Sequence, residues 1–85
     1  MANNVNKQFN EIRRINIESE FEINRIITEC RGLLAALGDS RGPVEDAIRN
    51  RLADLLVRSE IRRAQILRYR EDINDRQDEL ERQYD

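Results

Sequence analysis

Glycine and proline are nearly absent from this chain, and the few that occur indicate its architecture. The 85 residues include only 3 Gly and 1 Pro. All of them except Gly32 fall within one break near the middle of the chain, Gly38-Asp39-Ser40-Arg41-Gly42-Pro43. Gly is favoured where a helix ends in a left-handed conformation, and Pro is favoured in the first turn of a helix. The break therefore predicts one turn between two long helices.

The chain has no His and a single Cys, which restricts the chemistry available to it. Without His, the common acid–base and Ser/His or Cys/His nucleophilic arrangements are excluded, and so are most transition-metal sites. Gly38 and Gly42 do not have the spacing of a phosphate-binding loop. Cys30 has no partner for an internal disulfide, and we expect a buried structural thiol. We therefore expect a protein that is not an enzyme and that uses no metal or cofactor.

Aromatic residues and long apolar runs are also scarce. Aromatic residues make up 5% of the chain, and no apolar run approaches the roughly 20 residues that cross a bilayer. The first residues, Met1-Ala2-Asn3-Asn4, lack the basic region and apolar stretch of a secretory signal. The 15 basic and 17 acidic residues give a formal net charge of -2 at pH 7. We expect a soluble, cytoplasmic protein that does not contact a membrane.

Each long segment carries a regular apolar stripe with the spacing of a heptad repeat. The first stripe comprises Val5, Phe9, Ile12, Asn16, Ser19, Ile23, Ile26, Cys30, Leu33 and Leu37. The second comprises Ile48, Leu52, Leu55, Ser59, Arg62, Ile66, Tyr69, Ile73, Arg76 and Leu80. These stripes predict an all-α antiparallel hairpin. Its helices cover about 4–37 and 44–82, its turn covers 38–43, and the hairpin forms a single domain over 1–85.

Folding the segments against each other also brings opposite charges together. The stretch from Arg49 to Arg70 holds seven Arg, and it would pass acidic residues of the first helix such as Glu20. The acidic end of the second helix would pass Arg13 and Arg14. Complementary charges of this kind help to set the orientation and register of paired helices.

Some apolar residues remain after this seam is filled. They are Ile17, Phe21, Ala53, Val57, Ile61 and Ala64. Two helices cannot enclose the core that usually stabilises a monomer of this length, so we expect self-association, most simply as a dimeric four-helix bundle. These residues are the predicted interface, either between two copies of the chain or with another protein. Arg51, Asp54 and Arg58 form a predicted polar recognition face.

These observations favour a non-enzymatic protein–protein interaction module. Its partners are a second copy of itself, giving a homo-oligomer and most simply a homodimer, and another protein. An adaptor, an assembly factor, a scaffold and a small regulatory inhibitor all fit this description. Nucleic acid is a disfavoured partner, because acidic residues outnumber basic ones and aromatic side chains for stacking are few.

One passage allows a second interpretation. Apart from Ser19, residues 15–23 alternate apolar and polar side chains, as a half-buried strand does. Ser19 with Glu22 also has the spacing of a capping box. We favour a continuous helix there. A strand at Arg14 to Glu18 followed by two helices would resemble the ribbon-helix-helix repressors and antitoxins. That resemblance implies a dimer whose paired strands contact DNA.

A further alternative comes from a short motif after the turn. Pro43-Val44-Glu45-Asp46-Ala47-Ile48-Arg49 resembles the Pro-Val-x-Asp-x-x-Arg stretch of small all-helical chorismate mutases. The resemblance covers seven residues. It implies an enzyme in which Arg14 and Arg31 would bind substrate.

Overall fold

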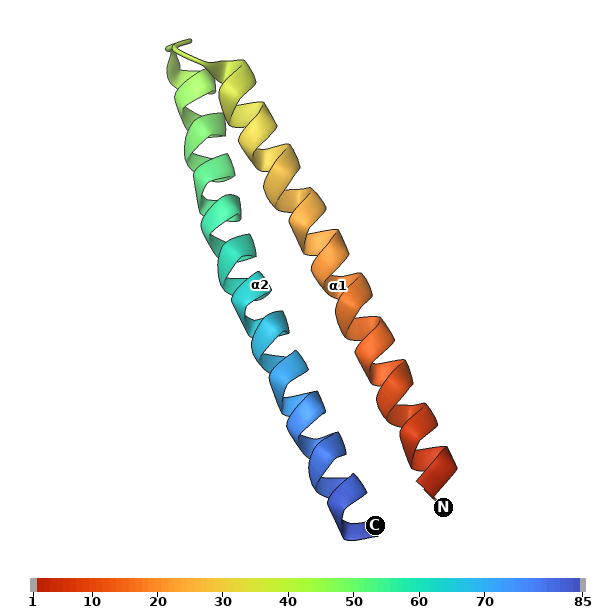
Figure 1. Cartoon of the computed structure of the whole chain (residues 1–85). Helices are drawn as coiled ribbons and strands as arrows, with labels where there is room; N and C mark the ends of the chain where they lie inside the picture. The colour runs from red at the N-terminus through yellow and green to blue at the C-terminus, as the bar shows by residue number, and fades with distance from the viewer. Residues whose placement is uncertain (1, 85) are drawn as a thin grey trace.

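Two long antiparallel helices make up the chain. A computed structural model describes the backbone of residues 2–84 and the side chains of residues 4–83. Helix α1 spans Ala2–Leu37 and helix α2 spans Pro43–Tyr84 (Figure 1). The hairpin measures 64 by 15 by 13 Å between Cα atoms. The predicted all-α antiparallel hairpin is confirmed, whereas its pairing with a second hairpin stays a prediction. Residues 1 and 85 of the predicted domain lie outside the described residues.

Helix α1 runs without interruption through residues 15–23, so the favoured continuous helix is confirmed and the strand is wrong. The Ser19 hydroxyl donates to the carbonyl of Ile15 at 2.8 Å, a contact made within the helix, and no helix begins at this Ser. The alternating apolar residues point to different sides of α1, with Ile15 and Ile17 about half exposed. The strand that a ribbon-helix-helix protein needs for DNA is therefore not formed.

The turn is built as the Gly and Pro positions predict. Gly38 has a φ of 51°, and its amide donates to the carbonyl of Leu34 at 3.2 Å. This left-handed residue ends α1, because a side chain there would be strained. Arg49, in the second turn of α2, donates to the carbonyls of Gly38 and Ser40 at 3.1 and 2.7 Å. These bonds hold the start of α2 beside the end of α1.

The helices meet along a seam with heptad spacing. In α1 the seam residues, all buried or half-buried, are Val5, Phe9, Arg13, Asn16, Glu20, Ile23, Ile27, Cys30, Leu34 and Leu37. In α2 they are Glu45, Arg49, Leu52, Leu56, Ser59, Arg63, Ile66, Arg70, Ile73, Gln77 and Leu80. Among the described side chains, the fully buried apolar ones are Ile27, Cys30 and Ile66. The core is thin, and the predicted burial of Cys30 is confirmed.

Each predicted stripe consists of two rows of residues spaced seven apart. One row of each stripe lies on the seam, as predicted, whereas the prediction for the other row was wrong. The confirmed rows include Ile23 and Leu52. The apolar residues of the other rows are partly exposed on one side of the seam: Ile12, Ile26, Leu33, Ile48, Leu55 and Tyr69. The residues one position further along, such as Ile27 and Leu56, face the other helix instead. Adjacent apolar pairs allow either choice, and polar contacts between the helices favour the one observed.

The main polar contact is a network in the middle of the hairpin. Asn16 is buried, and its Nδ2 donates to the carbonyl of Ile66 at 2.8 Å. Arg70 donates to Asn16 Oδ1 at 2.8 Å and to Glu20 Oε1 at 2.6 Å. A buried Asn with fixed partners can specify the register of paired helices, because sliding either helix breaks its bonds.

Candidate functional site: the open face of the hairpin

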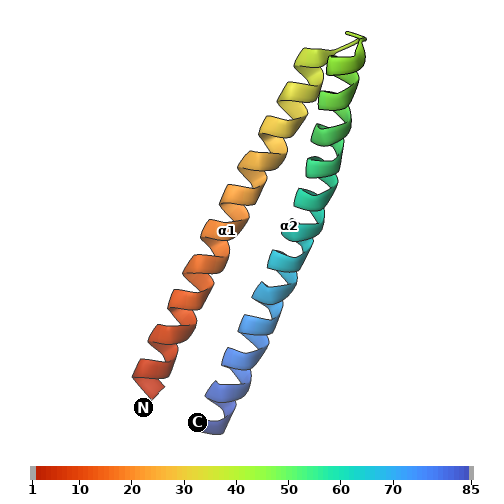
Figure 2. The same ribbon diagram turned by 180° about the vertical axis from the view of Figure 1, so that it is seen from behind.

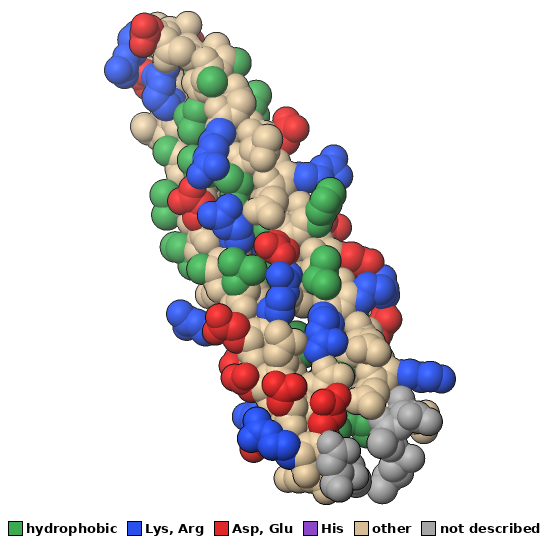
Figure 3. Space-filling view, viewed as in Figure 1, with side chains coloured by type: hydrophobic (Ala, Val, Ile, Leu, Met, Phe, Trp, Pro, Cys, Tyr) green, Lys and Arg blue, Asp and Glu red, His purple; other side chains and the backbone are tan. Residues whose placement is uncertain are grey.

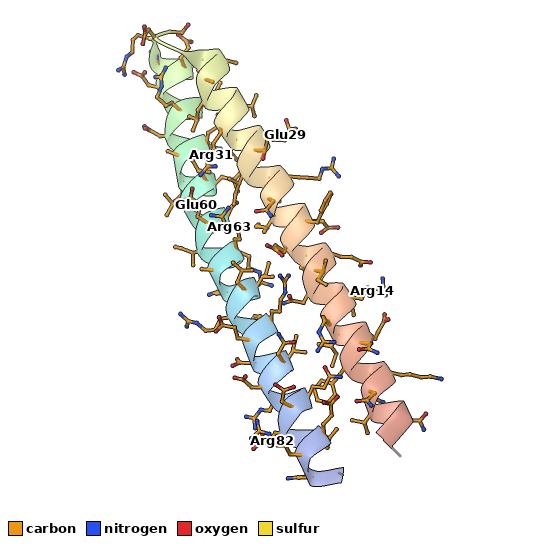
Figure 4. All side chains as sticks on the ribbon, in the orientation of Figure 1. Arg14, Glu29, Arg31, Glu60, Arg63 and Arg82 are labelled. Atoms are coloured by element: carbon orange, nitrogen blue, oxygen red, sulfur yellow. The ribbon has the colours of Figure 1, made fainter. Side chains whose placement is uncertain are left out.

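One side of the hairpin is crossed by polar contacts, and we call it the sealed face. Arg31 Nη2 lies 2.9 Å from Glu60 Oε1, and Arg63 Nη1 donates to Asn24 Oδ1 at 3.4 Å. Figure 4 shows Arg31, Glu60 and Arg63 between the helices. The space-filling view shows acidic and basic side chains along the same line (Figure 3). Polar groups therefore bridge the two helices on this face.

The polar contacts of the sealed face continue toward the termini. Some of them are the predicted ion pairs, and others involve amide side chains instead. The contact of Arg70 with Glu20 confirms that the Arg-rich stretch of α2 passes the acidic residues of α1. Arg13, however, donates to the side-chain amide oxygens of Asn74, at 3.0 Å, and of Gln77. The predicted pairing of Arg13 with the acidic end of α2 is replaced by contacts with amides.

The opposite side carries apolar side chains that the described residues leave about half exposed, and we call it the open face. Its members are Ile12, Ile15, Ile26, Leu33, Ile48, Leu55 and Tyr69, exposed by between 41 and 53%. They flank the seam because the heptad positions beside the buried rows of two antiparallel helices project to the same side. Figure 2 views the hairpin from this side. Exposed apolar residues gathered on one face mark an interaction surface.

Two grooves run along the open face. The groove nearer the turn has a volume of about 460 Å³ and is lined by apolar residues of both helices, including Ile26, Leu33 and Leu55, with Cys30 also in its lining. Glu22 and Glu29 of α1 border it, together with Arg25. Because both helices contribute walls, a partner seated here would contact α1 and α2 together.

The groove nearer the termini has a volume of about 390 Å³. It is lined by Ile12 and Ile15 of α1 and by Tyr69 of α2, and Asp72 lies at its edge. Arg62 also lines it. This groove offers an aromatic ring and a guanidinium beside aliphatic side chains.

The six predicted interface residues are separate from the open face. Ile17 and Phe21 line a shallow groove on the surface of α1, and Val57 and Ile61 are more than half exposed on α2. Ile17 lies two heptads before Arg31, and Ala53 lies one heptad before Glu60, so both flank the polar line of the sealed face. Ala64 is also exposed. Their assignment as an interface stays a prediction.

The predicted polar recognition residues border the open face. Arg58 Nη1 lies 3.3 Å from Asp54 Oδ2 one turn earlier on α2, and both side chains are exposed. Arg51 and Arg58 share the helical position of Asp72, which borders the groove near the termini. They therefore lie where charged residues of a partner seated on the open face would pass. Asp54 lies further outward and serves as a local partner of Arg58.

Arg14 and Arg31, which the chorismate mutase resemblance would assign to substrate, do not converge. Figure 4 shows them apart along α1. Arg14 bonds to Glu11 and Glu18 of its own helix, with 2.5 Å between Nη1 and Glu18 Oε1. Its hydrogen bond with Glu11 lowers the pKa of that carboxyl and raises the pKa of the guanidinium. Arg31 is paired with Glu60, so these two arginines do not form one anion site within the chain.

Within residues 2–84, no three Cys, Asp or Glu side chains gather as they would around a metal ion. Neither of the two described helices contains a stretch both long and apolar enough to cross a membrane. No protein-family model matches the chain, and neither a curated protein nor a solved structure matches it.

Proposed function

We propose that the chain is a non-enzymatic interaction module that self-associates and binds a further protein. It would act as an adaptor, an assembly factor, a scaffold or a small regulatory inhibitor. Self-association uses the open face, and the further protein meets the outer apolar residues predicted from the sequence: Ile17, Phe21, Ala53, Val57, Ile61 and Ala64.

The open face is the observation that carries this proposal. Leu33 and Leu55 remain 53% and 43% exposed beside a seam with a thin apolar core. Apolar surface left in water costs about 25 cal/mol for each Å², so covering this face stabilises the hairpin as well as the complex. Helical hairpins with one uncovered apolar face commonly complete a bundle with further helices.

DNA binding is the second candidate, and the observation in its favour is the Arg-rich stretch of α2. Arg51 and Arg58 lie on one side of that helix and are exposed. Other arginines of the stretch, including Arg63 and Arg70, are directed to α1. Since the DNA-contacting strand is not formed either, this candidate would depend on phosphate contacts alone, which weaken steeply as salt rises.

The test is the solution mass measured by light scattering, with and without random duplex DNA at low salt. A multiple of the 10.1 kDa chain mass that ignores DNA is the expected result. Partner capture with the wild-type chain and with Phe21→Glu then examines the outer residues. A mass that rises with DNA and falls back with salt would favour the second candidate. A single-chain mass at every concentration would contradict self-association.

A further inference from the structure

The charges along the edge of the open face identify what covers it. We propose that the occupant is a second copy of this chain, packed face to face with its turn at the opposite end. A two-fold axis perpendicular to the helices relates the two copies. This inference rests on the proposed self-association and assigns its geometry.

The rim of α2 is the set of residues that recur once per heptad beside the open face: Arg51, Arg58, Gln65, Asp72 and Glu79. Of these rim residues, the two that precede Gln65 are basic and the two that follow it are acidic. Antiparallel packing of α2 against the second copy's α2, centred on Gln65, sets Arg58 opposite Asp72 and Arg51 opposite Glu79. The two-fold axis repeats both pairs, so this rim complements itself.

The same two-fold axis also gives favourable contacts between the two copies of α1. Arg63 bonds to Asn24, so Gln65 lies near the level of Glu22 in the hairpin. An axis at this level sets Ile12 of one copy opposite the second copy's Leu33. These are exposed apolar residues of the open face, and such pairs form the layers of a helical bundle.

The polar residues on the open face also find suitable neighbours about this axis. Arg62 lies opposite the second copy's Tyr69, and a guanidinium over an aromatic ring is attractive. Leu55 lies opposite the second copy's Arg76, whose aliphatic stem can cover it while the charge stays in water. Arg62 and Arg76 interrupted the predicted α2 stripe, and in this arrangement neither is buried without compensation.

The opposite orientation, with both turns at one end, fits less well. It would pack α1 of one copy against α2 of the other. Glu29 would then meet Arg58 and Leu33 would meet Leu55, but Ile26 would lie opposite Arg62. Ile15 would lie opposite a carboxylate in both orientations, that of Asp72 in this one and that of Glu29 in the antiparallel one. Only one rim pair would be complementary, compared with two in the antiparallel arrangement.

The open face is also large enough for a specific dimer. A stable protein interface buries roughly 800 Å² on each partner. The hairpin is 64 Å long and 15 Å across at its Cα atoms, and exposed apolar residues follow most of that length from Ile12 to Ile48. A second hairpin of the same size would cover the face from end to end.

Charge reversal along the α2 rim tests the proposal. Arg51→Glu/Arg58→Glu makes the rim wholly acidic, and Asp72→Arg/Glu79→Arg makes it wholly basic. We expect each double variant to weaken the dimer on the order of 10- to 100-fold at low salt, since exposed pairs contribute about 0 to 1 kcal/mol each. The combined variant restores complementarity and should recover the wild-type dissociation constant. Arg68→Glu/Arg82→Glu, on the outer side of α2, matches the first change in charge and should leave the dimer intact.

A pair of like charges close to the two-fold axis allows a second measurement. In the antiparallel arrangement Glu22 approaches its own copy near the axis, so Glu22→Gln should strengthen the dimer by up to several-fold. In the other orientation Glu22 faces Gln65, and the substitution has no such effect.

The outcomes separate the two proposals. A wild-type dimer whose combined rim variant stays as weak as the double variants would overturn the antiparallel arrangement and leave self-association standing. A wild-type chain that is monomeric throughout would contradict the proposed self-association itself.

Discussion

The two sides of this hairpin are made of different chemistry. On the sealed face, Arg31 meets Glu60 and Arg63 meets Asn24 across the seam, whereas the open face presents Leu33 and Leu55 to solvent. The difference separates two tasks. Polar contacts with exact partners fix how α1 and α2 align, because they are lost when either helix slides. Apolar area supplies the free energy of association, which is not directional.

The largest effect should come from a charge on the open face. Leu55→Glu should dissociate the dimer and reduce helix content, because a carboxylate in a bundle core costs on the order of 3 kcal/mol or more. Val57→Glu is the matched control, since Val57 lies two residues away with 54% exposure against 43% for Leu55. Light scattering and circular dichroism at the same concentration measure both effects. Dissociation by the Val57 variant alone would move the interface to the outer residues.

A smaller effect should follow from breaking the polar network under the sealed face. Arg70→Met leaves Asn16 Oδ1 and Glu20 without this donor, and we expect a loss of about 1 to 3 kcal/mol in the free energy of unfolding. Arg31→Met removes a more exposed pair and should cost less than about 1 kcal/mol. Urea unfolding at one protein concentration compares them. Equal losses would show that burial does not distinguish these contacts.

Two glycines lie away from both faces, and replacing them with Ala should change the stability of the chain in opposite directions. Gly38 has a φ of 51°, so Gly38→Ala should destabilise the chain by about 1 to 2 kcal/mol. Gly32 lies inside α1, and an added Cβ would have no atom within 4 Å apart from the adjacent backbone of its own helix, so Gly32→Ala should stabilise the chain by about 0.5 to 1 kcal/mol. Thermal unfolding reports both changes, and neither should alter the solution mass. A stabilising change at Gly38 would contradict its place as the end of α1.

The smallest effect is expected on the exposed surface of α1. Arg14→Gln removes the hydrogen bond that lowers the pKa of Glu11, so NMR titration should find that pKa raised toward its ordinary value. A lowered carboxyl pKa stabilises the folded chain above the pKa of the unfolded state, and this contribution is lost as the pH falls through the folded pKa. The substitution should barely change the urea midpoint at neutral pH. A large shift would mean that Arg14 contacts more than its own helix.

The sequence predicted the hairpin, because Gly38 and Pro43 carry specific backbone preferences that local context did not override. It predicted one row of the seam for the same kind of reason, since Ile23 and Leu52 have the correct period. The second row of the seam lies one residue further along the chain than the stripe predicted. Ile26 and Ile27 are adjacent and equally apolar, so periodicity alone cannot assign which one faces α2.

The candidate site was harder to predict from one chain. The charge pattern predicted that Arg13 and the Arg-rich stretch of α2 pass opposite charges. It did not predict that Arg13, Arg63 and Arg70 lie on the seam itself, where amide and carboxylate partners accept their hydrogen bonds. The hydrogen bond of Asn16 to the carbonyl of Ile66 has no sequence signature at all. Once these polar groups face the seam, the apolar stripe beside them becomes the open face.

The most direct test compares the two surfaces by thiol labelling. Ile26→Cys reports on the open face and Phe21→Cys on the outer surface of α1, with buried Cys30 left in place. Pulse labelling with a maleimide, followed by mass spectrometry, is repeated as protein concentration rises. We expect the thiol at position 26 to become protected as the dimer forms, while the thiol at position 21 stays reactive. Equal labelling of both thiols at every concentration would contradict a covered open face.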